Sequence, residues 1–140
     1  MVLMFLNGGA MRGGELHHLL SGAPLVAVVK TAPKYRFHSV GDRFPALEPG
    51  GDAAVAGELY DVPWDVLRDS LLPAEPDELE LGVIELEDGS GTLSMVRRRT
   101  YREPAGAYRD ISGYAGWHAY QDSQHSQDSQ DFQDSLEAKP

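Results

Sequence analysis

Two loops in this 140-residue sequence carry residues that could do chemistry: a glycine-rich loop near the N-terminus and an acidic loop in the middle. The first, NGGAMRGG at 7–14, lies between an apolar run and a helix-like stretch. A loop of this kind leaves backbone N–H groups free and can form a small anion or oxyanion pocket. It is not a P-loop, because no Gly-Lys-Ser/Thr follows, nor a dinucleotide-binding fingerprint. The alternative is a tight strand-to-helix turn that requires small residues.

The acidic loop Glu75-Pro76-Asp77-Glu78, with Glu80 beyond it, supplies a carboxylate for proton transfer. A glutamate can act as general acid and base when partial burial raises its pKa toward neutrality. The alternative is a solvated acidic loop. Glu58 differs because it falls inside the strand-like run at 54–62. A buried carboxylate there is costly unless paired, so Glu58 either points to solvent or lines a polar pocket.

Other kinds of site are disfavoured. The chain has no cysteine, which excludes thiol catalysis and thiolate metal sites. His17 and His18 are adjacent, so on a helix they point about 100° apart and do not form a metal-binding pair. No serine lies in a Gly-x-Ser-x-Gly context. We therefore predict no metal site and no cofactor.

The charge of the chain bounds its partners. A net charge of −10 argues against nucleic acid and anionic membrane surfaces, because both require a cationic face. The apolar run at 2–6 is too short for a signal peptide or a membrane span. We expect a soluble cytoplasmic protein that acts on a small molecule. No pattern indicates an oligomeric state.

Apolar periodicity predicts a small α+β domain around a twisted or closed sheet. The expected helix at 61–72 has Asp61 near its cap and Pro63 in its first turn, and Gly22 is expected to end the helix before it. The turn at 88–91 predicts a hairpin. Strands are expected at 2–6, 24–31, 34–40, 54–62, 79–87 and 92–98, and helices at 13–21, 61–72 and 113–120.

Composition divides the chain into a domain at 1–120 and an acidic tail at 121–140. The tail begins with five triplets, QDS-QHS-QDS-QDF-QDS. Such polar repetition buries too little apolar area to offset the entropy of ordering, so we predict that the tail is disordered. The alternative is an interaction tail.

Five segments in order resemble the γ-glutamylcyclotransferase-like (AIG2-like) superfamily, and together they cover residues 2–120. In that superfamily a first strand runs into a Tyr-Gly-Ser/Thr-Leu-x-x-Gly loop. The loop at 7–13 keeps both glycines but lacks the Tyr and the Ser/Thr. The other four are most similar to one branch, the C-terminal domain of allophanate hydrolases and its stand-alone relatives. They read TAPKYRFHSV, AAVAGELYDVP, LELGVIELEDGS and RDISGYAGWHAY.

The resemblance implies a small mixed β-barrel, closed or nearly closed, with flanking helices. In cyclotransferases the loop N–H groups bind the γ-glutamyl group, and one glutamate shuttles a proton while the substrate amine attacks its own carbonyl. No metal or enzyme nucleophile is needed. Glu75 is the best match to that glutamate and Glu78 the second. The allophanate hydrolase branch usually has no acid there, and its domain is accessory to an amidase domain.

Our leading hypothesis is therefore a cyclotransferase-like enzyme that acts on an amide or urea-like molecule, with Glu75 as general acid and base. Tyr35 and Arg36 are candidate pocket donors, although Tyr35 could equally be a core aromatic with its hydroxyl at the rim. The alternative hypothesis is a non-catalytic binding or assembly module that partners a separate amidase. The reaction stays open between cyclisation, hydrolysis, decarboxylation and binding alone. The substrate carbonyl or carboxylate is expected to bind at Asn7, Gly8, Gly9, Ala10 and Met11.

Overall fold

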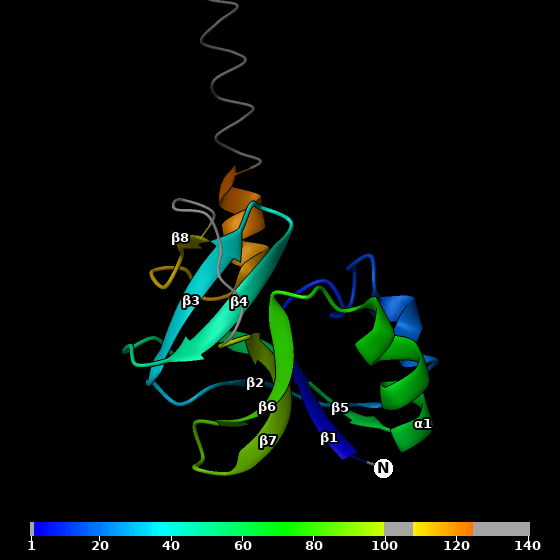
Figure 1. Cartoon of the computed structure of the whole chain (residues 1–140). Helices are drawn as coiled ribbons and strands as arrows, with labels where there is room; N and C mark the ends of the chain where they lie inside the picture. Colours follow the sequence, from blue (N-terminus) through cyan, green and yellow to red (C-terminus); the bar gives the residue numbers. More distant parts are fainter. Residues whose placement is uncertain (1, 100–107, 125–140) are drawn as a thin grey trace, which may run out of the picture.

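A computed structural model describes residues 2–99 and 108–124 of the chain. Two sheets and several short helical segments make up this part (Figure 1). The strands are β1 (Val2–Leu6), β2 (Leu25–Lys30), β3 (Tyr35–Val40), β4 (Phe44–Pro49), β5 (Ala56–Val62), β6 (Leu79–Glu85), β7 (Gly91–Arg97) and β8 (Tyr108–Asp110). The helical segments are η1 (His17–Leu20), α1 (Trp64–Val66), η2 (Leu67–Leu71), η3 (Leu72–Ala74) and residues 117–124.

The larger sheet has the order β2-β5-β1-β7-β6, with β1 and β7 parallel and the other pairs antiparallel. The smaller sheet has the order β4-β3-β8. The mixed α+β class predicted from the sequence is confirmed. A barrel is not confirmed, because the five-stranded sheet is not closed: its edges meet at one bridge, between Thr31 and Leu86.

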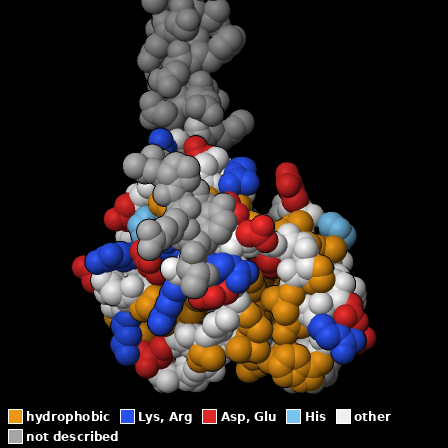
Figure 2. Space-filling model, viewed as in Figure 1, with side chains coloured by type: hydrophobic (Ala, Val, Ile, Leu, Met, Phe, Trp, Pro, Cys, Tyr) orange, Lys and Arg blue, Asp and Glu red, His pale blue; other side chains and the backbone are white. Residues whose placement is uncertain are grey.

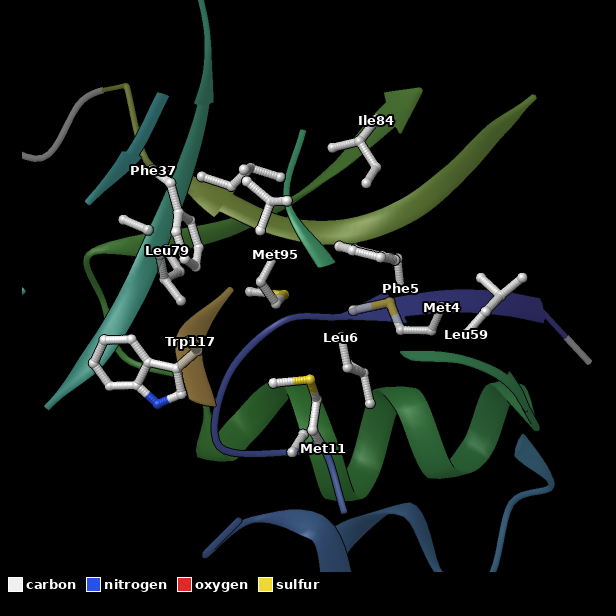
Figure 3. Close-up of a cluster of buried hydrophobic side chains, with 14 of the residues drawn as sticks. Met4, Phe5, Leu6, Met11, Phe37, Leu59, Leu79, Ile84, Met95 and Trp117 are labelled. Atoms are coloured by element: carbon white, nitrogen blue, oxygen red, sulfur yellow. The ribbon is translucent and has the colours of Figure 1, made fainter. Parts of the chain in front are cut away.

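Strand β1 lies in the middle of the core because it is apolar on both faces. Met4, Phe5 and Leu6 are all buried. Side chains alternate along a strand, so Leu6 faces the helical layer while Phe5 faces the opposite side, toward Ile84 (Figure 3). Because both faces of β1 are covered, the end of this strand is a fixed point from which the glycine-rich loop departs.

The helix expected at 13–21 is shorter in the structure and is the 3₁₀ segment η1. The glycines explain the difference. Gly13 has a φ of +83°, in the left-handed region that a right-handed helix cannot contain. At the other end Ser21 and Gly22 both have positive φ, so the predicted stop near Gly22 is confirmed.

The second expected helix begins three residues later than predicted. Asp61 is not near its cap, because β5 continues to Val62 to complete its pairing with Val2 of β1. The helical run therefore starts at Trp64, with Pro63 as its extended N-cap, and passes through α1, η2 and η3 to Ala74. This run brings the chain to Glu75.

The hairpin of β6 and β7 around the turn at 88–91 is confirmed, as are the strands predicted for β1, β2, β3 and β5. Two strands were not predicted. Strand β4 contains Pro45 and Pro49, and proline is uncommon in strands, so the sequence did not predict it. The prolines are tolerated because β4 lies at the edge of its sheet, where a missing N–H costs little. Strand β8 has three residues, too few to show a periodicity.

The last predicted helix begins at 117 rather than 113 and is helical through 124, past the expected domain boundary at 120. The boundary and the disorder of the tail stay predictions, and residues 125–140 lie outside the described residues. No helix in the described part of the chain is long and apolar enough to cross a membrane.

Several apolar side chains are exposed on the larger sheet and on α1. Figure 2 shows hydrophobic side chains gathered over the area where β1, β7 and α1 lie in Figure 1. Exposed large hydrophobic residues include Leu3 of β1, Trp64 of α1, and Leu81 and Val83 of β6, of which Val83 is 75% exposed. Contiguous exposed apolar surface is typical of a contact with another molecule.

Candidate functional site

A pocket of about 770 Å³ opens where the two sheets and the helices meet. Its wall combines the end of β1 and the glycine-rich loop, the turn between β3 and β4, the segment around Glu75 and the helix at 117–124. The volume is in the range of pockets that hold small molecules. The main lining segments are residues 5–10, 13–16, 42–45 and 74–76, together with Leu79, Met95, Trp117, His118 and Gln121.

The glycine-rich loop folds back on itself through backbone hydrogen bonds. The Met11 amide donates to the Gly8 carbonyl at 3.1 Å, and the Leu16 amide donates to the Gly9 carbonyl at 2.9 Å. At Gly8 and Gly14 other atoms lie so close to the backbone that a side chain would not fit. A Cβ at Gly14 would lie 2.0 Å from the Gly9 carbonyl oxygen, and one at Gly8 would lie 2.8 Å from Pro45. The small residues are therefore consistent with both interpretations of this loop, a tight turn and a pocket wall.

Donors of this loop remain available to a ligand. Within the described residues, no hydrogen-bond partner is found for the amides of Gly8, Gly9 and Ala10, all of which line the pocket. Asn7 also lines it and is 8% exposed, and its buried side-chain Nδ2 has no partner there either. An unpaired buried donor is costly, so these groups favour a ligand that carries an acceptor oxygen.

Met11 is the exception among the predicted loop residues. It does not line the pocket, and its amide donates a hydrogen bond to the Gly8 carbonyl. Its side chain is buried in the core beside Leu6 (Figure 3). Met11 anchors the loop instead of contacting the pocket.

A carboxylate from β5 clamps the loop. Glu58 accepts hydrogen bonds from the Arg12 amide at 2.8 Å, from Arg12 Nε at 2.9 Å and from the Tyr60 hydroxyl at 2.8 Å. Burial alone would raise the pKa of Glu58, but these donors outweigh it and hold that pKa below its usual range. Burial and the adjacent carboxylate raise the pKa of Tyr60 to about 12. Glu58 neither points to solvent nor lines the pocket, in contrast to both sequence expectations.

Glu75 is in the opposite situation. It lines the pocket directly after η3, between Ala74 and Pro76, and no hydrogen bond or ion pair reaches its carboxyl from the described residues. No donor offsets the effect of burial, which therefore raises the pKa of Glu75 to about 7. A group that titrates there can both accept and donate a proton at neutral pH.

Glu78, the second candidate, is not in the pocket wall. Its buried carboxylate accepts a hydrogen bond from Arg43 Nη2 at 2.9 Å. Arg43 itself does line the pocket. Glu78 thus positions a pocket residue, whereas Glu75 faces the pocket directly.

Tyr35 and Arg36 lie away from the residues that line this pocket. The Tyr35 ring is buried in the core, and its hydroxyl accepts a hydrogen bond from the Glu85 amide at 2.7 Å. Arg36 is exposed on β3, opposite Glu48 of β4.

Several pocket residues were not predicted as site residues, among them Asp42, Arg43, Trp117 and His118. Asp42 and Arg43 follow β3 in a turn, which Asp42 enters with a φ of +58°. Asp42 accepts hydrogen bonds from Ser39 and Tyr120, which join this turn to the helix at 117–124. Glycine and aspartate are common in turns, but nothing in the sequence places the turn at Gly41 and Asp42 beside the loop at 7–14.

A metal site has no support in the geometry. Within residues 2–99 and 108–124, no group of three or more histidine, aspartate or glutamate side chains is arranged to hold an ion. The polar groups of the pocket include backbone amides, the Arg43 guanidinium and the His118 ring. They also include the amide side chains of Asn7 and Gln121 and the carboxyls of Glu15, Asp42 and Glu75.

These features define a class of protein: a small α+β domain in which a glycine-rich loop after the first strand and a half-buried carboxyl line one pocket. The model of the allophanate hydrolase C-terminal domain matches residues 2–122. The chain belongs to this family, which confirms the resemblance found in the sequence.

Solved structures agree with this assignment. The uropathogenic E. coli-specific protein c4763 is 30% identical, with a TM-score of 0.77 over 86% of this chain and 94% of that one. Kluyveromyces lactis allophanate hydrolase is 25% identical, with a TM-score of 0.77 over 87% of this chain but 21% of its own length. An AIG2-like protein from Mus musculus, 23% identical over 74% of this chain and 80% of that one, shares the fold at a TM-score of 0.57. No curated protein sequence matches the chain.

The clamp on the loop can be tested with Glu58→Gln. A glutamine cannot accept all three hydrogen bonds, and we expect a loss of about 2 kcal/mol in the free energy of unfolding. Because the pKa of Glu58 is held low, its contribution is present above the ordinary glutamate pKa and is lost on acidification; the variant should lack this part of the acid sensitivity. Urea titrations at several pH values measure both. Tyr60→Phe, which removes one donor, should cost less.

Hydrogen exchange gives the local readout for the same variant. The Arg12 amide should exchange faster in Glu58→Gln, because its acceptor is weakened. Unchanged stability together with unchanged exchange at Arg12 would contradict a clamping role.

The pH dependence of stability expected from Glu75 is opposite to that expected from Glu58. Its folded pKa of about 7 lies above the ordinary value of 4.5, so the folded state binds the proton more tightly. Its stabilising effect is complete below pH 4.5 and is lost as the pH rises through 7. Glu75→Gln should therefore be more stable than the wild type at pH 8, by at most about 3 kcal/mol, since Glu75 keeps some exposed surface. Urea titrations of both proteins at pH 4.5 and pH 8 measure the difference in the free energy of unfolding. A wild type that is as stable as Glu75→Gln at pH 8, or more stable, would refute this prediction.

Proposed function

We propose that this protein is a small enzyme that moves a proton on an amide- or urea-type compound, with Glu75 as general acid and base. The observation that carries the proposal is an uncompensated carboxyl with a pKa of about 7 in the wall of a pocket. Structural carboxylates in this chain, such as Glu58 and Glu78, are instead paired with donors. An ionised carboxyl left without donors lowers the stability of the fold, so its presence in a pocket supports a chemical role.

The glycine-rich loop supports the other half of the reaction. Its free amides at Gly8, Gly9 and Ala10 can bind a carbonyl oxygen and stabilise the negative charge that develops there. In the step we envisage, an amine or water attacks the carbonyl carbon while Glu75 accepts its proton. The carbon–nitrogen bond then breaks, and Glu75 returns the proton to the leaving nitrogen. No net proton is consumed by the enzyme, and positioning supplies the remaining rate enhancement.

The proposal is tested by turnover of a panel of γ-glutamyl amides, simple ureas and ureido acids, followed by proton NMR. With any substrate found, Glu75→Gln should lower kcat by about 100-fold or more, the usual contribution of a general acid or base. The control is Glu87→Gln, an exposed glutamate outside the pocket wall, which should leave kcat unchanged. The pH profile should show a group near 7 that the glutamine variant lacks. Full turnover by Glu75→Gln would rule out this mechanism.

A second function is favoured by a different observation. The matched domain makes up 21% of Kluyveromyces lactis allophanate hydrolase, and this chain exposes Trp64 and Val83 at its surface. Both facts support a module that docks on a separately encoded amidase. In that case the isolated chain turns over none of the panel and co-purifies with an amidase, and Val83→Lys abolishes the complex. Localisation in the cytoplasm belongs to the same proposal.

A further inference from the structure

In the described part of the chain, one edge of the two sheets lacks the features that keep edge strands from pairing with other chains. Strand β2 has a bulge between Leu25 and Ala27, β4 contains Pro45 and Pro49, and β8 is very short. Strand β6 instead pairs with β7 in unbroken register along its whole length, without proline or bulge, and residues 81–84 carry no charge. Of these edges, β6 is the one suited to accept a further strand.

The backbone groups at one end of the β6 edge are already used. The Glu85 amide donates to the Tyr35 hydroxyl at 2.7 Å, and the Glu85 carbonyl accepts from the Ala32 amide at 2.9 Å. Neither partner belongs to β7, so Glu85 directs both groups away from β7. In an antiparallel pair this direction alternates from residue to residue, so Val83 and Leu81 direct their backbone groups to the same outer edge.

The backbone groups at the other end of this edge are used as well. The Leu79 amide donates to the Pro76 carbonyl at 3.1 Å, and the Leu79 carbonyl accepts from Arg98 Nη2 at 2.9 Å. Between these ends, the outward N–H and C=O groups of Leu81 and Val83 have no hydrogen-bond partner within residues 2–99 and 108–124. Their side chains are 38% and 75% exposed. Free backbone groups beside exposed apolar side chains favour the addition of a strand from another protein.

The free groups are arranged symmetrically about Gly82, which suits a second copy of the same strand. When a two-fold axis relates two copies, residue i contacts residue j and residue j contacts residue i. An axis at Gly82 places Leu81 opposite Val83 of the second copy, and each such pair exchanges both of its N–H···O bonds. The two Gly82 residues then face each other without side chains between them. One register therefore satisfies every free group of this edge.

Charge also permits a second copy at this edge. Two chains of net charge −10 repel each other, so they can meet only where their surfaces carry little local charge. Residues 81–84 are uncharged, and the flanking Glu85 is paired with Lys34 at 2.6 Å. Because salt screens the repulsion between the rest of the two chains, pairing at this edge should become tighter as the ionic strength rises.

We propose that the outer edge of β6 is a dimer interface, at which the β6 strands of two copies pair antiparallel about Gly82. The two five-stranded sheets then form one continuous sheet. A contact of this length buries little area, so the dimer is weak and depends on protein concentration. Leu81, Gly82 and Val83 do not line the pocket, so the proposal does not rest on the role of Glu75.

Sedimentation velocity of the full chain, from micromolar to millimolar concentration, tests the interface. We expect the apparent mass to rise from 15.3 kDa toward twice that value, and to rise further at higher salt. Val83→Lys should stay monomeric throughout, because it places a like charge on both copies at the edge. Val28→Lys is the matched control, since Val28 is 65% exposed on β2 at the other edge of the same sheet, and it should dimerise as the wild type does.

Hydrogen exchange shows whether backbone pairing holds the dimer. The amides of Leu81 and Val83 should exchange several-fold more slowly at millimolar than at micromolar concentration. The Gly82 amide, which is directed to β7, should change little. In Val83→Lys the exchange at Leu81 should not depend on concentration.

Cross-linking tests the register, and the chain has no cysteine of its own to interfere. Leu81 and Val83 of the second copy would lie about 5.5 Å apart between Cα atoms, a separation that a disulfide spans. A mixture of the Leu81→Cys and Val83→Cys variants should therefore form the mixed disulfide in preference to either self-linked dimer.

Several results would overturn the proposal. These are a monomer at millimolar concentration, equal loss of the dimer in Val83→Lys and Val28→Lys, unchanged exchange at Leu81 and Val83, and self-linked dimers as the main cross-linked product. An amidase that protects the same two amides while the chain alone stays monomeric would assign the edge to that partner and also overturn it.

Discussion

Glu58 ties the glycine-rich loop to the centre of the larger sheet, and the geometry of the pocket depends on that contact. The carboxylate comes from β5, which pairs with β1 residue by residue, so it stands beside the strand end from which the loop leaves. By accepting from both the amide and the side chain of Arg12, it fixes the middle of the loop. The buried Met11 side chain holds the same turn from the core. A glycine-rich segment that would otherwise be costly to order is thereby held in one conformation.

The contrast between two glutamates follows from this arrangement. Glu58 is buried with three donors and stays ionised, whereas Glu75 is half-buried with no donor from the described residues and is partly protonated at neutral pH. The amides of Gly8, Gly9 and Ala10 line the same pocket as Glu75, and within the described residues they have no hydrogen-bond partner. Arg43, which lines the same pocket, is paired with Glu78. Acidic, amide and cationic groups therefore coexist in one pocket without cancelling one another, which is what a ligand with several polar groups requires.

The sequence allowed the local features to be predicted, and tertiary contacts account for most of the rest. The hairpin at 79–98, the apolar strand β1 and the candidate Glu75 carry strong local signals, and five ordered segments identified the family. Strand β4 was missed because its prolines are acceptable only at a sheet edge, which a sequence does not reveal. Arg43 and His118 were missed as pocket residues because they reach it from turns and helices far along the chain. The partner of Glu58 could not be foreseen, since Arg12 is 46 residues away.

The central claim is that Glu75 is a desolvated carboxyl group in a ligand pocket, and its ionisation can be measured directly. A ¹³C NMR titration of the glutamate side-chain carboxyls, with Glu75 assigned through the Glu75→Gln variant, reports each pKa separately. The account predicts a midpoint for Glu75 near 7, well above that of the exposed Glu87. A midpoint near 4.5, the ordinary value for glutamate, would contradict it.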